Sequence, residues 1–222
     1  MKPRMTLVLG TLSLVAAYAL WVGTQIPAAS ADMGQMLSAT SNVSAALLAA
    51  DAEFVGVSKC KKCHLAEHKS WEKGPHAKAL ESLKPGNATE AKTKFKLDPA
   101  KDYSKDAACV ACHTVGFGKP GGYQIPADEE AAKKMKNLEG VGCENCHGAG
   151  GSYIAVHEEI MKSKRKYKID EMHATGTVTP DKAVCLGCHN DKGPTFDASK
   201  PFDFEAMKAK GVHEIFPHKQ KE

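Results

Sequence analysis

Four copies of the pattern Cys-x-x-Cys-His use every one of the eight cysteines in this 222-residue chain. Two cysteines with this spacing place both thiols on one helical turn, and the next histidine lies beside them. The pattern is typical of c-type heme attachment, because both thiols can bind one porphyrin while the imidazole binds its iron. Zinc ribbons and disulfide frameworks need no histidine after each pair, so we exclude both. The copies are Cys60, Cys63 and His64; Cys109, Cys112 and His113; Cys143, Cys146 and His147; and Cys185, Cys188 and His189.

The composition predicts a fold that depends on these cofactors. Aromatic residues make up 6% of the chain and the mean hydropathy is −0.35, which is little material for an apolar core. Four covalently attached c hemes would supply the missing apolar surface, so the apoprotein should be largely unfolded. We therefore expect a mainly α multiheme cytochrome c with long loops, organised around four hemes. Residues 84–105 and 116–126 are rich in Gly, Pro, Lys and Asp and are predicted to be loops that wrap the cofactors.

The N-terminus has the features of an export signal. Lys2 and Arg4 precede an apolar stretch over residues 5–23, and Ala29-Ser30-Ala31 is a pattern that signal peptidases accept. We expect cleavage and a periplasmic protein. An uncleaved membrane anchor stays open, since the apolar stretch of about nineteen residues is long enough to span a bilayer, and an extracellular location is a weaker alternative. The predicted organisation is a signal peptide at 1–31, a flexible linker at 32–52 and a tetraheme domain at 53–222.

The charge pattern excludes one class of partner. The formal net charge is +4, and basic residues are scattered without interleaved aromatic residues, so nucleic-acid binding has no support. One dense basic run spans residues 162–168. It is explained by a solvated helix end or by pairing with heme propionates, and alternatively by docking onto an acidic redox partner.

Six of the ten histidines lie outside the cysteine motifs and could bind iron from the distal side. Methionine is a poor alternative because few methionines lie in the folded part, so we expect mostly bis-histidine irons. His76 should begin a short helix after a Gly-Pro break, His157 lies in an apolar-periodic stretch, and His213 should lie in a C-terminal helix.

The other three histidines are weaker candidates. His68 lies on the same helical face as His64 and is expected to be exposed. His173 and His218 have polar neighbours and are expected to face solvent.

Further patterns lie outside and between the cysteine motifs. They are Ala50-Asp51-Ala52, Ser70-Trp71 with His76-Ala77-Lys78-Ala79, Glu81-Ser82-Leu83-Lys84-Pro85, Lys96-Leu97-Asp98-Pro99-Ala100-Lys101-Asp102-Tyr103, Gly116-Phe117-Gly118 with Gly121-Gly122-Tyr123, and Gly140-Val141-Gly142-Cys143-Glu144 with Cys146-His147-Gly148. Together they make the chain closely resemble the cytochrome c-554 family, tetraheme electron carriers of bacterial ammonia oxidation. The resemblance is dense over residues 50–157 and loose elsewhere.

The resemblance implies a set of axial ligands. It pairs His157 with His64 at the first heme, His76 with His147 at the third, and His213 with His189 at the fourth. The second heme, at His113, would be five-coordinate. The residues agree with this count, since three good distal histidines exist for four irons, although His173 remains an alternative ligand for the second heme. The chain departs from the family pattern between the third and fourth motifs and in its short C-terminal region.

We expect the protein to transfer electrons between redox partner proteins. The resemblance implies a donor like hydroxylamine oxidoreductase and an acceptor that is a downstream cytochrome or a membrane quinone-linked protein. An enzymatic alternative is nitric oxide reduction at an open second heme, although we expect an electron carrier rather than an enzyme. A third possibility is an oligomer, the subunit of an extracellular cytochrome filament. No arrangement for hydrolytic or phosphoryl chemistry is visible.

Overall fold

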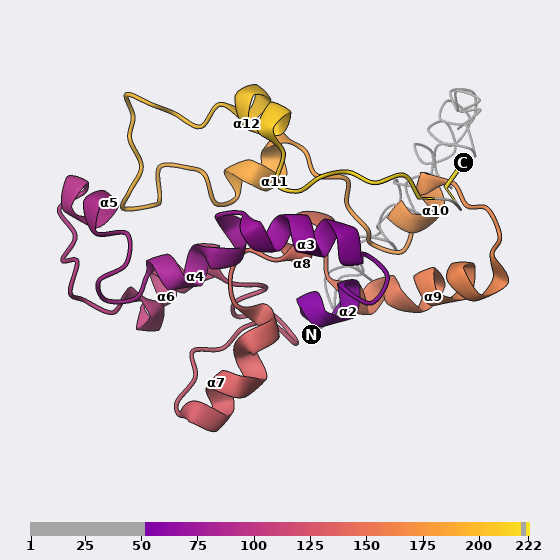
Figure 1. The fold of residues 1–222 in the computed structure, drawn as a ribbon, viewed down its shortest axis with the longest axis horizontal. Helices are drawn as coiled ribbons and strands as arrows, with labels where there is room; N and C mark the ends of the chain where they lie inside the picture. The colour runs from indigo at the N-terminus through magenta and orange to yellow at the C-terminus, as the bar shows by residue number, and fades with distance from the viewer. Residues whose placement is uncertain (1–51, 219–220) are drawn as a thin grey trace, which may run out of the picture. The chain divides into compact units, whose positions relative to one another are not determined.

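The structure is a computed structural model, and it describes residues 52–218 and 221–222. Within these residues it consists of short helices joined by long loops, without a β-strand (Figure 1). This confirms the predicted mainly α fold class. The α-helices are α2 (Val57–Cys60), α3 (Leu65–Lys73), α4 (Ala79–Ser82), α5 (Thr89–Lys94), α6 (Ala107–His113), α7 (Glu129–Met135), α8 (Cys143–His147), α9 (Ile154–Ser163), α10 (Ile169–His173), α11 (Lys182–Leu186) and α12 (Phe204–Lys210). The 3-10 helices are η2 (His76–Lys78), η3 (Tyr103–Lys105), η4 (Lys136–Leu138) and η5 (Gly150–Ser152).

Aspartate N-caps fix where several of these short helices begin. Each capping carboxylate accepts a hydrogen bond from a backbone N–H in the first turn, which satisfies a donor that the helix leaves free. Two of the capped helices, α6 and α11, lead directly into cysteine motifs. The caps are Asp106 for α6, Asp128 for α7, Asp181 for α11 and Asp203 for α12.

Two clusters of buried apolar side chains hold the described residues together. The larger cluster surrounds α6, where Val110 is fully buried, and includes Leu80 of α4. The smaller cluster lies on α9 and α10, where Ile160 is fully buried and packs with Met172. By contrast, α11 and α12 contain no buried residue. The polypeptide therefore supplies a core around the second cysteine motif and none around the fourth.

The predicted loops are confirmed in one region and wrong in part of another. Residues 116–126 contain no helix or strand. Residues 84–105, however, contain α5 and η3. Within α5, Lys92 is buried, and its ammonium donates to the backbone carbonyl of Lys84 over 2.6 Å. A lysine that stabilises carbonyls at the end of a neighbouring helix gives α5 a fixed position that composition alone does not reveal.

The C-terminal helix ends before the histidine that it was predicted to carry. Helix α12 ends at Lys210, and Gly211 follows with a φ of +72°. Glycine adopts this left-handed conformation at little cost and commonly ends helices. His213 therefore lies on the segment after the helix.

The predicted signal peptide at 1–31 and nearly all of the predicted linker at 32–52 lie outside the described residues. Among the residues that the structure describes, none of the helices has the length and apolarity needed to cross a bilayer.

Candidate heme sites

The four cysteine motifs form four similar local structures, which we call sites 1 to 4 in chain order. Sites 2 and 3 lie entirely on α6 and α8. At sites 1 and 4 the helix ends within the motif, but the histidine N–H still donates to the first cysteine carbonyl over 2.9 Å. No disulfide involves any of the eight cysteines, all of which lie in the described residues. Each site thus presents two thiols and an imidazole on one helical turn, an arrangement that fits covalent heme attachment.

The sites lie in a row whose order differs from their order in the chain. Cys60 of site 1 lies next to Cys143 of site 3, where α2 packs against α8. Cys112 of site 2 likewise lies next to Cys188 of site 4. Sites 3 and 4 meet where α8 packs against α11. The row therefore runs from site 1 through sites 3 and 4 to site 2.

Three of the four motif histidines face a second imidazole. A metal-binding imidazole nitrogen lies about 2 Å from the metal, so two imidazoles on opposite faces of one iron have centroids about 6 Å apart. The ring centroids of His64 and His157 are 5.7 Å apart. The two remaining pairs are His76 with His189 at 6.1 Å and His147 with His213 at 6.4 Å. All three separations fit the space that one heme iron needs.

Two of these pairs correct the pairing that the resemblance implied. His76 faces His189 of site 4 rather than His147, and His213 faces His147 of site 3 rather than His189. The position of His76 is fixed by contacts with the segment before site 3. Its carbonyl accepts a hydrogen bond from the N–H of Val141 over 2.9 Å. Gly140 lies so close that an added Cβ would fall 2.9 Å from the same carbonyl.

Site 2 is the exception. Among the described residues, no second imidazole makes a ring contact with His113. Its Nδ1 lies 2.7 Å from the carbonyl of Ala79, which accepts the N–H and leaves Nε2 as the nitrogen that can bind iron. Helix α4 and the adjoining η2 therefore orient site 2 through Ala79 and provide the second imidazole of site 4 through His76.

The three weaker histidines have different positions. The prediction that His68 is exposed was wrong: it is 6% exposed, and its ring lies 5.3 Å from that of Trp71. The Nε2 of His173 lies 2.9 Å from the hydroxyl of Thr179, so the alternative that His173 caps site 2 gains no support. His218 is exposed, but its ring contacts that of His64 at 5.1 Å.

Burial keeps most of the paired imidazoles in the form that binds a metal. Removal from water disfavours the charged imidazolium and so lowers the histidine pKa. A neutral imidazole has a lone pair free for iron. Burial is the main cause of a lowered pKa at His64, His76, His147, His157 and His189.

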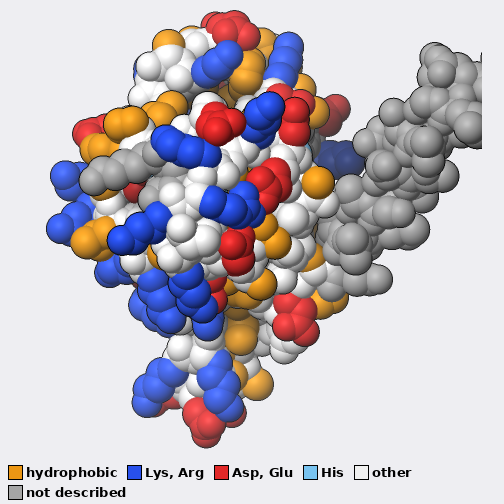
Figure 2. All heavy atoms as spheres, turned by 90° about the vertical axis from the view of Figure 1, so that its right-hand side faces the viewer, with side chains coloured by type: hydrophobic (Ala, Val, Ile, Leu, Met, Phe, Trp, Pro, Cys, Tyr) orange, Lys and Arg blue, Asp and Glu red, His pale blue; other side chains and the backbone are white. Residues whose placement is uncertain are grey.

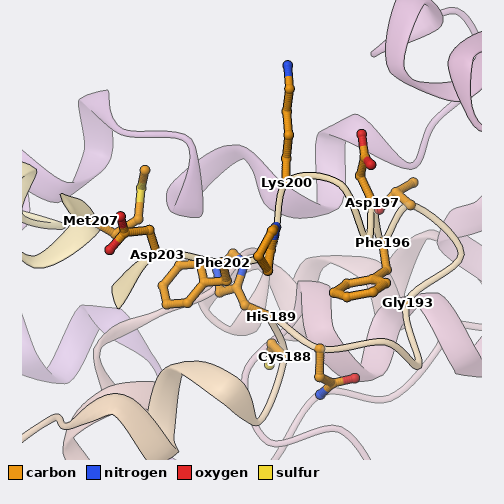
Figure 3. Close-up of a pocket in the computed structure, with 12 residues that line it drawn as sticks. Cys188, His189, Gly193, Phe196, Asp197, Lys200, Phe202, Asp203 and Met207 are labelled. Atoms are coloured by element: carbon orange, nitrogen blue, oxygen red, sulfur yellow. The ribbon is translucent and has the colours of Figure 1, made fainter. Parts of the chain in front are cut away.

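A cavity of about 440 Å³ lies beside the cysteine and histidine of site 4. Figure 3 shows the ring of Phe202 against His189, with Met207 and Phe196 on either side. Phe202 and His189 are stacked, with a centroid distance of 4.4 Å and an interplanar angle of 16°. The walls also carry polar and charged side chains, among them Asp197, Lys200 and Asp203. An open cavity of this size next to a cysteine and a histidine fits the bulk of a porphyrin.

Site 3 contains a buried carboxylate, that of Glu144, to which the sequence analysis gave no role. Glu144 lies between the two cysteines of the motif and is 3% exposed. It accepts hydrogen bonds from the N–H groups of Val55, Gly56 and Gly150, over 2.7 to 2.9 Å for the closest contact of each. Backbone donors of this kind stabilise a buried carboxylate. Glu144 thereby ties the start of the described domain to site 3.

Comparisons with known proteins agree with this arrangement. The family model for cytochrome c554 and c-prime matches residues 59–148. Cytochrome c-554 of Nitrosomonas europaea is 42% identical over 190 residues, which cover 76% of this chain and 78% of that protein. The solved structure of reduced cytochrome c554 from the same organism matches with a TM-score of 0.67 and 37% identity, covering 78% of this chain and 91% of that one. The resemblance inferred from the sequence is confirmed, and the chain belongs to the cytochrome c-554 family, multiheme c-type cytochromes that carry electrons on covalently bound hemes.

Proposed function

We propose that each of the four sites holds one c heme, and that three of these hemes have two histidine ligands. The motif histidines would be the proximal ligands, and His157, His213 and His76 the distal ligands of sites 1, 3 and 4. The single observation that carries this proposal is the set of imidazole pairs at 5.7, 6.4 and 6.1 Å. Histidine pairs give hemes lower reduction potentials than histidine–methionine pairs.

The bound hemes would supply reversible one-electron chemistry, while the chain orients the ligands and limits the access of water. Acceptors at the Nδ1 atoms fix which nitrogen of each ring is free for iron. The carbonyl of Val178 lies 3.3 Å from Nδ1 of His147, and that of Glu214 lies 2.7 Å from Nδ1 of His213. Because the sites lie in one row, neighbouring cofactors would follow the order 1, 3, 4, 2.

We propose that the protein works outside the cytoplasm, as a domain at 53–222 preceded by a cleaved signal peptide at 1–31 and a linker at 32–52. Its partners would be a donor like hydroxylamine oxidoreductase and an acceptor cytochrome or quinone-linked membrane protein. The basic run supports a charged docking surface only in part, because Arg165 is engaged with Glu159 and Glu171. Figure 2, which looks onto the side of the molecule with α9 and α10, shows basic side chains over much of this face with acidic ones among them.

The donor can be tested with purified components. The oxidised holoprotein is mixed with hydroxylamine, with and without hydroxylamine oxidoreductase, and heme reduction is followed by absorbance. We expect rapid reduction only when the oxidoreductase is present. Equal rates in both mixtures would contradict the proposed donor, and a protein that cannot be reduced and reoxidised by any mediator would contradict the carrier function itself.

A second candidate function is binding or reduction of nitric oxide at site 2. It rests on the observation that His113, alone among the motif histidines, faces no second imidazole in the described residues. An open iron position binds small ligands readily. Addition of nitric oxide should change the absorbance of one heme in four. An unchanged spectrum would remove this candidate.

A further inference from the structure

Glu67 places a carboxylate next to the motif histidine of site 1. It lies in the first turn of α3, three residues after His64, so both side chains are on one face of the turn. Its Oε2 lies 3.9 Å from Nδ1 of His64, and the Glu67 side chain is only 17% exposed. The other carboxylate oxygen, Oε1, lies 4.0 Å from Nε2 of His218. Glu67 thus lies between two imidazoles, at the distance of an ion pair rather than of a hydrogen bond.

Among the described residues, no carboxylate forms such an ion pair with any of the other three motif histidines. At site 2 the Nδ1 of His113 faces the carbonyl of Ala79, and at site 3 the Nδ1 of His147 faces the carbonyl of Val178. At site 4, His189 stacks on Phe202. A carbonyl presents a partial charge and a phenyl ring carries no net charge, whereas a carboxylate presents a full negative charge. Site 1 therefore differs electrostatically from the other three.

This charge acts on the oxidation state of an iron bound to His64. The ferric state carries one more positive charge than the ferrous state, so a nearby carboxylate stabilises the ferric state more. The partly buried position of Glu67 limits solvent screening. The same attraction favours a proton on the Nδ1 of His64 and so leaves Nε2 as the nitrogen that binds iron.

We propose that Glu67 is a positioning residue that acts through His64 and holds the reduction potential of site 1 below the value its two histidines alone would give. This inference rests on the proposed function, since it requires His64 to be an iron ligand. Site 1, at one end of the row, would then have a lower reduction potential than a heme with the same two histidine ligands and no carboxylate beside them.

The test is a redox titration of the Glu67→Gln holoprotein, followed by electron paramagnetic resonance of the separate low-spin irons. The substitution keeps the shape and removes the charge. We expect one low-spin heme to shift to a more positive potential, by roughly tenfold in its one-electron equilibrium constant, or about 59 mV. The heme content and the number of low-spin irons should stay the same. Glu67→Asp should restore much of the original potential.

Two further variants make the result specific. Glu72→Gln removes a charge from the exposed surface of the same helix and should leave all potentials in place. His157→Ala should abolish the low-spin signal of site 1 and thereby identify it. If His157→Ala removes a low-spin signal but Glu67→Gln shifts no potential, or shifts it no more than Glu72→Gln does, the role of Glu67 is overturned. If His157→Ala leaves every low-spin signal intact, the ligand assignment itself is wrong.

Discussion

Sites 2 and 4 are neighbours, since Cys112 lies next to Cys188, yet they are built in opposite ways. Site 2 lies in the larger apolar cluster, where Val110 is fully buried, and His113 faces no second imidazole among the described residues. Site 4 lies on α11, which has no buried residue, and its His189 faces His76 across 6.1 Å.

The difference shows two ways to fix a heme ligand. At site 2 the polypeptide alone orients the imidazole, through an apolar cluster and the carbonyl of Ala79, so no second ligand is needed to hold it. At site 4 the polypeptide supplies little core, and the cofactor itself would have to join α11 to the segment that carries His76. We therefore expect the polypeptide around site 4 to need its heme in order to stay folded. The polypeptide around site 2 should stay folded without its own heme, which would serve redox chemistry alone.

The largest effect should come from removing one attachment site. In the Cys185→Ala/Cys188→Ala variant, residues 181–213 should lose protection from hydrogen exchange, because they bury almost no apolar surface of their own. In the matched Cys109→Ala/Cys112→Ala variant, residues near Val110 should keep most of their protection from hydrogen exchange. Mass spectrometry would confirm one heme fewer in each. Equal loss of protection in both variants would contradict the claim that site 4 depends on its heme for structure more than site 2 does.

Removing the second imidazole of site 4 should change the spin state of one heme iron. In His76→Ala, one of the three expected low-spin irons should become high-spin, because a five-coordinate histidine iron remains. Paramagnetic NMR should assign the change to the heme attached at Cys185 and Cys188, as the distance to His189 requires. A change at the heme of Cys143 and Cys146 would favour the pairing that the family resemblance implied.

The apolar core around site 2 should contribute several kcal/mol to the free energy of unfolding. Leu80 of α4 is 4% exposed, and Leu80→Ala should destabilise the holoprotein by about 2 to 5 kcal/mol, through lost burial and the cavity left behind. Denaturant unfolding followed by circular dichroism would measure it. Ile215→Ala, at a position 90% exposed, should change stability by no more than about 0.5 kcal/mol. Similar values for both variants would contradict a protein core at site 2.

The smallest effect concerns the stacked ring at site 4. Phe202→Leu removes an aromatic contact with His189 worth about 0.5 to 1.5 kcal/mol, while it keeps most of the apolar volume. The low-spin signal of site 4 should shift slightly, because the imidazole plane is held less firmly. Phe196→Leu is the control, since Phe196 lines the same cavity without a stacking contact of this kind. Equal shifts would mean that stacking has no orienting role.

The features that the sequence predicted well are local. The spacing of Cys143, Cys146 and His147 dictates one helical turn, and α8 spans it. The apolar-periodic stretch that contains His157 lies in α9. The pairing of His76 with His189 was beyond such reasoning, because it depends on contacts between segments far apart in the chain.

Residues that act through burial also escaped prediction. Glu144 is an unremarkable acidic residue in sequence, and only the three backbone N–H groups around it reveal its role. Glu67 lies near His64 in the chain, but its low exposure could not be read from spacing. His68 lies four residues after His64, which is the N-cap of α3, and it was wrongly expected at the surface. The spacing could not show that Trp71 packs beside it.

The most direct test of the account is an electron paramagnetic resonance spectrum of the fully oxidised holoprotein. Three imidazole pairs and one lone motif histidine predict three low-spin irons and one high-spin iron. Four low-spin irons would show that another residue caps site 2, and two or more high-spin irons would show that at least one of the histidine pairs does not hold a heme.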